Sequence, residues 1–144
     1  MADRTSSTIV IKGGRPEITA VIADLEGYPE WAGGIHGVEV LEARPDGRPA
    51  RVRMTIDAGP IKDTIALAYE WDGDEGVRWT LVEKGNVVTS LHGSYRLTER
   101  DDGTEVTYEL AVDSRIPMIG MVKRKGEKMI IESALKGLKR RVER

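Results

Sequence analysis

The sequence contains no cysteine and no phenylalanine, and its longest apolar runs are only four or five residues. The absence of cysteine excludes disulfide bonds, zinc–thiolate sites and thiol nucleophiles, and it is consistent with a reducing cytoplasm. Apolar runs this short cannot cross a bilayer, which takes about 20 residues. The beginning of the chain, MADRTSS, is polar and lacks the apolar core of a secretory signal. We therefore expect a cytoplasmic protein.

Histidine is also scarce, since His36 and His92 are the only two. Two histidines are too few for an ordinary catalytic zinc site unless carboxylates complete it. No GxSxG, HExxH or phosphate-loop motif is present. The acidic residues at 72–75 and 101–102 stand in Gly-containing turns, where Asp is common for structural reasons. We expect neither a metal nor a cofactor.

The formal net charge of −2 argues against a nucleic-acid partner. This total conceals an asymmetry, because residues 117–144 hold nine Lys or Arg and only three Glu. The rest of the chain is correspondingly acidic. One terminal segment of the protein is therefore basic.

The periodicity of apolar residues divides the chain into three parts. A short strand at 7–12 is followed by helical spacing from Ile18 to Leu25, with Pro16 at the helix start and a second single turn expected over 29–32. From Val38 to Asp113 the period is two, and five turn signals divide that stretch into six antiparallel strands. Residues 116–142 return to helical spacing and form the longest predicted element. We expect one domain, 1–144.

Strand alternation assigns the side chains to two faces of the predicted sheet. Five of the seven aromatic residues fall on one apolar face, and the long helix is the natural cover for that face. They are Tyr69, Trp71, Trp79, Tyr95 and Tyr108. Three methionines of the long helix, Met118, Met121 and Met129, are expected on its apolar side. An apolar wall with a few phenols is typical of a small-molecule pocket, and it is equally what a plain core would need.

The order of elements resembles the START-like, or helix-grip, fold. Within that fold the chain is similar to the polyketide cyclase/dehydrase branch of the SRPBCC superfamily. The residues that carry the match are VIADLEGYPEWAGGIHGVEVLE (21–42), VRWTLVEKG (77–85), GSYRLTE (93–99) and IPMIGMVKRKGEKMI (116–130). The resemblance implies an α+β fold: a seven-stranded curved antiparallel sheet wrapped around the long C-terminal helix, with two short helices after the first strand.

The resemblance also implies a deep cavity between sheet and helix that holds a lipid, isoprenoid or polyketide. The segment after the first helix would then lie at the cavity entrance, with Tyr28 and Trp31 as lid or anchor and His36 near the mouth. The alternative for His36 is a solvated side chain. The residues expected to bind the ligand are Tyr28, Trp31, His36, Met54, Ile56, Leu67, Tyr69, Trp71, Trp79, Leu81, Leu91, Tyr95, Tyr108, Met118, Met121 and Met129.

Three functions follow from these expectations. The first is a carrier or chaperone that binds a hydrophobic small molecule. The second is a polyketide aromatase/cyclase or dehydrase that uses the same cavity, with Tyr69, Tyr95, Tyr108 and Arg115 as candidates for proton transfer. The other arginines of the strands fall on the outward face, so Arg115 is the one candidate cation. The third is an adaptor with a vestigial cavity.

The basic face of the long helix has two functional interpretations besides that of a solvated surface. A lipid carrier would use it to approach an anionic membrane. A cyclase would use it to bind an acidic acyl carrier protein. Aromatic residues that would stack on bases are absent from this face, which also argues against nucleic acid.

Overall fold

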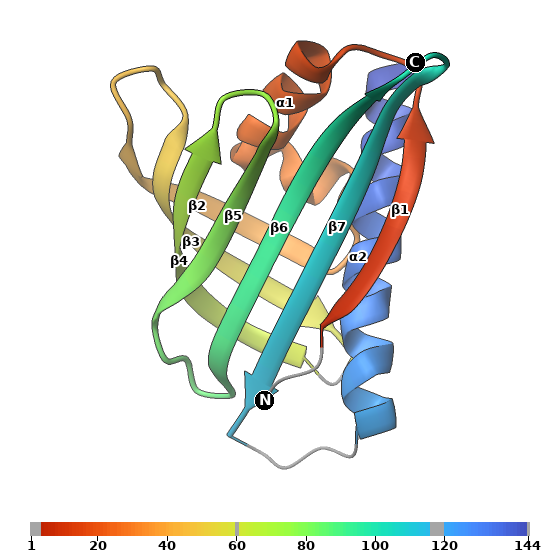
Figure 1. Ribbon diagram of the computed structural model, residues 1–144. Helices are drawn as coiled ribbons and strands as arrows, with labels where there is room; N and C mark the ends of the chain where they lie inside the picture. Colours follow the sequence, from red (N-terminus) through yellow and green to blue (C-terminus); the bar gives the residue numbers. More distant parts are fainter. Residues whose placement is uncertain (1–3, 60, 116–119, 144) are drawn as a thin grey trace.

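The computed structural model describes residues 4–59, 61–115 and 120–143 (Figure 1). Seven strands, two α-helices and one 3-10 helix follow each other within these ranges. The first part comprises β1 (Thr5–Ile11), α1 (Arg15–Ala23), the 3-10 helix η1 (Leu25–Glu30) and β2 (Ile35–Ala43). The second part comprises β3 (Pro49–Ala58), β4 (Ile61–Asp72), β5 (Gly76–Glu83), β6 (Val88–Arg100), β7 (Gly103–Ser114) and α2 (Gly120–Glu143).

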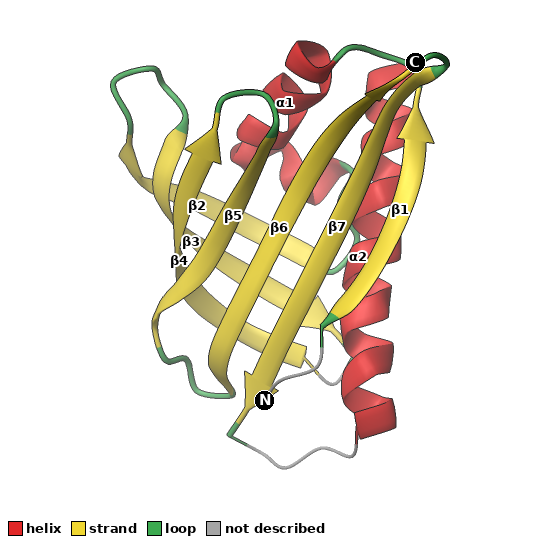
Figure 2. Cartoon of the chain, viewed as in Figure 1, coloured by secondary structure: helices red, strands yellow, loops and turns green. Residues whose placement is uncertain are grey.

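The strands form one antiparallel sheet in the order β1-β7-β6-β5-β4-β3-β2. The first strand pairs with the last, with Thr5 opposite Leu110 and Ile11 opposite Thr104. The sheet is strongly curved, and α2 runs along its open side next to β1 and β7 (Figure 2). The fold is therefore the expected helix-grip arrangement, with a concave sheet that faces a long helix.

The start of the chain differs in one detail from the sequence expectation. Helix α1 begins as predicted, with Pro16 in its first turn and Ile18 and Ile22 buried. The single turn expected over 29–32 is instead the 3-10 helix η1, which starts at Leu25 and includes Pro29. Pro29 is the fifth of the six residues of η1, so a helix that starts at Leu25 is already formed before the proline removes one backbone N–H donor.

The predicted strand alternation is confirmed. In β3, Val52, Met54 and Ile56 are buried while Arg51 and Arg53 are exposed. All five predicted turns join consecutive strands of the sheet. The apolar face of every central strand is thereby directed toward α2, because successive side chains of a strand point to opposite sides.

Helix α2 buries the predicted Ile130, Ala134, Leu135 and Leu138 but differs from the prediction over its first turns. Its buried side consists of Glu127, Ile130, Ile131, Ala134, Leu135 and Leu138. Met121, Val122 and Met129 are 72%, 38% and 41% exposed, so the expectation that they lie on the inner side is wrong. The methionines were assigned inward because they are apolar, whereas the register of α2 is set by its branched residues and by Glu127.

Glu127 is completely buried and attaches α2 to the edge of the sheet. The Val112 N–H donates a hydrogen bond to Glu127 Oε2 (2.7 Å), and the Thr5 hydroxyl donates to Oε1 (2.7 Å). Thr5 is the first residue of β1, so β7 continues beyond the end of its partner strand at this point. The carboxylate supplies the acceptor that a longer β1 would have provided to the β7 backbone.

Candidate functional site

The concave face of the sheet and α2 enclose an internal cavity of about 30 Å³. This volume holds about two water molecules, since one water requires roughly 10–15 Å³. Every strand from β2 to β7 contributes to its wall, together with η1 and α2. The lining residues are Tyr28, Ala32, Ile35, Met54, Ile56, Leu67, Tyr69, Trp79, Leu91, Tyr95, Tyr108, Leu110, Ile130 and Ala134.

An aromatic cluster occupies the sheet side of this cavity. The Trp79 ring lies 5.5 Å from the rings of Tyr69, Tyr95 and Tyr108, measured between centroids. Tyr95 and Tyr108 are 4.6 Å apart in an edge-on arrangement. These residues come together because Tyr69 pairs with Trp79 across β4 and β5, and Tyr95 with Tyr108 across β6 and β7.

Gly93 makes room for the central indole. It lies opposite Trp79 across β5 and β6, and a Cβ at this position would overlap the Trp79 ring. A larger residue at 93 would push the indole into the cavity. The position of the Trp79 ring therefore depends on Gly93 of β6 as well as on its own strand, β5.

The four tyrosines that line the cavity differ in their hydrogen bonding. The Tyr28 hydroxyl donates to the Ile22 carbonyl oxygen (2.5 Å). Within the part of the chain that the structure describes, the hydroxyls of Tyr69, Tyr95 and Tyr108 make no hydrogen bond, and none of these oxygens is fully buried. Burial of the residues raises the pKa of each phenol above its ordinary value. They are therefore neutral hydrogen-bond donors in the wall of one cavity.

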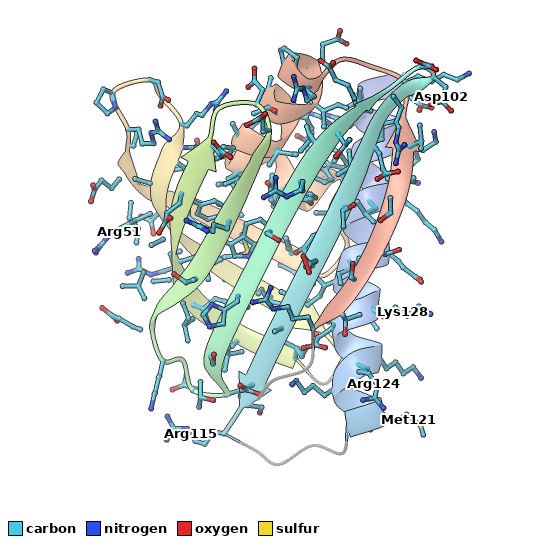
Figure 3. All side chains as sticks on the ribbon, in the orientation of Figure 1. Arg51, Asp102, Arg115, Met121, Arg124 and Lys128 are labelled. Carbon is cyan, nitrogen blue, oxygen red and sulfur yellow. The ribbon has the colours of Figure 1, made fainter. Side chains whose placement is uncertain are left out.

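No charged side chain lines the cavity among the described residues. Arg115, the one cation that the sequence offered as a candidate, is exposed, and its backbone N–H donates to the Val87 carbonyl oxygen (2.7 Å). Figure 3 shows its side chain directed away from the molecule at the end of β7. The interior can donate hydrogen bonds to a neutral oxygen, but it has no counter-charge for an anion.

The polyketide cyclase/dehydrase and lipid transport family matches this chain over residues 19–139. The chain belongs to this family. No curated protein matches its sequence significantly.

Solved structures agree with the fold of this polyketide cyclase/dehydrase family member. A START superfamily protein from Mycobacterium smegmatis is 24% identical, with 97% of each chain covered and a TM-score of 0.86. A protein from Thermus thermophilus is 26% identical over 97% of each chain, with a TM-score of 0.79. The Zhui aromatase/cyclase from a Streptomyces species is 17% identical, with 100% of this chain and 95% of that chain covered and a TM-score of 0.80.

Nine residues that the sequence assigned to a ligand site do line the cavity of this family member. They are Tyr28, Met54, Ile56, Leu67, Tyr69, Trp79, Leu91, Tyr95 and Tyr108. Strand alternation and the segment after α1 were the signals that identified them. Their role in binding a ligand stays a prediction.

Other predicted ligand-binding residues lie elsewhere. His36 is exposed on β2, and Met121 and Met129 are exposed on α2. Trp71 and Leu81 are partly buried at the margin of the core. The Trp71 indole N–H donates to the Pro49 carbonyl oxygen (2.8 Å) and its ring packs against Arg48. Neighbouring residues of a strand point to opposite faces of the sheet. Ile35 lines the cavity, so His36, the next residue, faces solvent.

Trp31 and Met118 complete the set. Trp31 is buried beside Tyr28, with 4.7 Å between ring centroids, and its backbone packs closely against Gly137 of α2. It therefore supports a cavity residue without lining the cavity. Met118 lies outside the described residues.

Five further residues line the cavity that the sequence did not assign to a ligand site: Ala32, Ile35, Leu110, Ile130 and Ala134. Leu110 shares the parity of Tyr108, so alternation alone contained that signal. No group of three or more His, Asp or Glu within the described ranges is arranged to hold a metal ion. None of the helices in these ranges has the length and apolar character required to span a membrane.

Proposed function

We propose that the protein binds a neutral hydrophobic small molecule that carries carbonyl or ether oxygens, as a carrier or chaperone. The observation that supports this most directly is that the hydroxyls of Tyr69, Tyr95 and Tyr108, in the cavity wall, have no protein acceptor among the described residues. A ligand oxygen would supply that acceptor, and such a hydrogen bond contributes about 0.5–1.5 kcal/mol. The apolar remainder of the wall favours a hydrophobic ligand.

The chemistry of the wall also favours one ligand class over another. A fatty acid would bring a carboxylate into an interior that has no cation among its lining residues. Burying an unpaired carboxylate is strongly unfavourable. A flat polyketide or quinone presents neutral oxygens and aromatic faces, and both complement the Tyr–Trp cluster.

Ligand uptake requires the interior to expand. Small-molecule sites are commonly about 300–1,000 Å³, an order of magnitude above the cavity of about 30 Å³. The protein would therefore bind by moving α2 or η1 away from the sheet. The same small volume also supports the adaptor hypothesis, in which the aromatic face is only a core.

The second candidate function is a polyketide aromatase/cyclase or dehydrase reaction in the same cavity. It is supported by Tyr69, Tyr95 and Tyr108, which all line that cavity. A neutral phenol can donate a hydrogen bond to a carbonyl oxygen as the carbonyl gains negative charge. The exposed position of Arg115 leaves this reaction without a cavity cation, so we favour binding over catalysis.

Binding is tested by native mass spectrometry of the purified protein and by titration with two matched probes, anthraquinone and anthracene. The probes share a planar ring system, but only anthraquinone has carbonyl oxygens. In the variant Tyr69→Phe/Tyr95→Phe/Tyr108→Phe we expect anthraquinone affinity to fall about fivefold for each hydrogen bond lost. Anthracene affinity should not fall.

Three other results would change the assignment. An equal loss of affinity for both probes in the triple Phe variant would contradict a hydrogen-bonding role of the phenols. Turnover of a polyketide by the wild type that the triple Phe variant loses would favour the enzyme. An empty protein that binds neither probe would favour the adaptor, whose most plausible contact is the basic face of α2.

A further inference from the structure

The part of α2 at which the helix begins combines exposed apolar side chains with exposed cations. Met121, Val122 and Met129 are the apolar members, and Met121 is the most exposed of them at 72%. Arg124, Lys125 and Lys128 are exposed on the same stretch of α2. We call these six residues the basic tip. Figure 3 shows Met121, Arg124 and Lys128 along the lower part of α2, with Arg115 on the other side of the molecule and Asp102 at the opposite end.

The cations of the basic tip are available for an external partner. Within the described residues, Arg124 and Lys125 form no ion pair. Lys128 has only the exposed Glu132 of its own helix, at 3.7 Å. Exposed pairs of this kind contribute little, so Lys128 can exchange its partner readily.

We propose that the basic tip docks onto an anionic lipid surface, and that the hydrophobic ligand of the proposed function enters and leaves at this contact. An acidic protein would meet the cations through exposed ion pairs and would leave the three apolar side chains unexplained. A membrane interface takes both at once, because apolar side chains insert at the acyl boundary while Lys and Arg attract anionic headgroups.

The position of the cavity supports this assignment. Met129 immediately precedes Ile130, the first residue of α2 that lines the cavity. Met129 also lies over the β3–β4 turn, where a Cβ on Gly59 would be 3.6 Å from its Cε. Separation of α2 from that turn would therefore open the cavity on the same side that faces the lipid.

The test is flotation of the full-length protein with vesicles of phosphatidylcholine alone and of phosphatidylcholine with phosphatidylglycerol. The charge variant is Arg124→Gln/Lys125→Gln, and its matched control is Lys136→Gln/Arg140→Gln, which removes two exposed cations from the other half of α2. The apolar variant is Met121→Ser/Val122→Ser. Its control, Leu41→Ser/Val82→Ser, alters two similarly exposed residues of the sheet.

We expect the wild type to float only with the anionic vesicles and to dissociate as salt is added. Each tip cation should contribute about fivefold to partitioning, so the charge variant, which lacks two, should lose about 25-fold. The apolar variant should lose binding as well, while both control variants bind like the wild type.

Three outcomes would overturn the proposal: no flotation of the wild type, equal losses in the tip and control variants, or capture of an acyl carrier protein by the tip cations without vesicle binding. Titration with anthraquinone separates this proposal from the proposed function, on which it rests. Probe binding without flotation would reject membrane docking by the basic tip and keep the proposed ligand binding. Flotation without probe binding would reject the proposed ligand binding and keep membrane docking.

Discussion

The carboxylate of Asp63 holds the loop between β5 and β6 against β4. Its Oδ2 accepts hydrogen bonds from the backbone N–H groups of Val87 and Val88 (both 2.9 Å), and Oδ1 accepts from Thr64 (2.8 Å). Gly85 fits beside it because a Cβ there would overlap Oδ2. Desolvation acts to raise the pKa of Asp63, but these backbone hydrogen bonds outweigh it and lower the pKa below its ordinary value.

We expect Asp63→Asn to destabilise the protein at neutral pH by about 1 kcal/mol, because an amide accepts fewer of these hydrogen bonds and the site is partly open to solvent. A carboxyl whose folded pKa is lowered contributes stability above its unfolded pKa of about 3.9. That contribution is lost as the pH falls through the folded value. Urea unfolding at several pH values should show the gap between wild type and variant closing below about pH 4.

The matched control for Asp63 is Asp57→Asn. Asp57 is exposed and its only ion-pair partner among the described residues is Lys62, at 3.8 Å. An exposed pair at this distance contributes little, so this variant should unfold like the wild type at every pH. A constant gap between Asp63→Asn and wild type down to acid pH would contradict the assigned role of the carboxylate.

The sequence predicted individual residues well where a regular period applies. Tyr69, Tyr95 and Tyr108 were assigned inward because strand side chains alternate, and the sheet keeps that alternation. Met129 was assigned inward as an apolar residue at helical spacing, and the phase of α2 turned it outward. Asp63 gave no signal, because an Asp near a turn looks the same whether it is solvated or receives three backbone N–H groups.

At the scale of elements, α2 packs unusually closely against residues 31–33, the segment that follows η1. A Cβ on Gly137 would overlap the carbonyl oxygen of Trp31, and one on Gly33 would lie 2.9 Å from the Ser133 side chain. Trp31 in turn packs on Tyr28, which lines the cavity. The distance between α2 and residues 31–33 therefore sets the position of one cavity wall.

We expect Gly137→Ala to destabilise the protein by roughly 1–3 kcal/mol, because the helix must move away from the Trp31 backbone. The direction of the change in stability is informative, because Gly→Ala inside a helix ordinarily stabilises a protein by about 1 kcal/mol. Thermal and urea unfolding measure the change. Lys136→Ala, at an exposed neighbouring position, should change stability by less than about 0.5 kcal/mol. A Gly137→Ala protein at least as stable as wild type would show that this contact is not tight.

The sequence predicted the elements more reliably than their contacts. Turn residues marked all five hairpins, because Gly and Asp at these positions serve the backbone locally. The pairing of β1 with β7 brings together residues about a hundred positions apart, and no local pattern encodes it. The close approach at Gly137 is invisible for the same reason, since a glycine in a helix has no preferred partner in sequence.

At the scale of the whole molecule, the curved sheet and α2 surround an interior that is almost filled by its own aromatic side chains. The resemblance to helix-grip proteins indicated a deep cavity, whereas the enclosed volume is about 30 Å³. The cavity volume is the space enclosed by the sheet and α2 minus the volume of the side chains inside it. This remainder is small compared with either volume. A sequence-based assignment that misplaces a single aromatic ring therefore changes the expected cavity volume completely.

Ligand uptake by such an interior should be limited by opening, not by encounter. In stopped-flow measurements of tryptophan fluorescence with anthraquinone, the observed rate should reach a plateau as probe concentration rises, because a conformational step precedes or follows binding. Lys123 of α2 donates to Asp113 of β7 (3.3 Å) near the start of the helix. Removing this contact in Lys123→Gln should raise the plateau severalfold.

The control for the opening step is Lys128→Gln, which removes an ion pair within α2 and none between α2 and the sheet. It should keep the wild-type plateau, since helix and sheet remain joined through Lys123 and Glu127. A rate that increases linearly with probe concentration up to the diffusion range would contradict an opening step. In that case the probe binds at the surface, and the aromatic interior serves as the core of the fold.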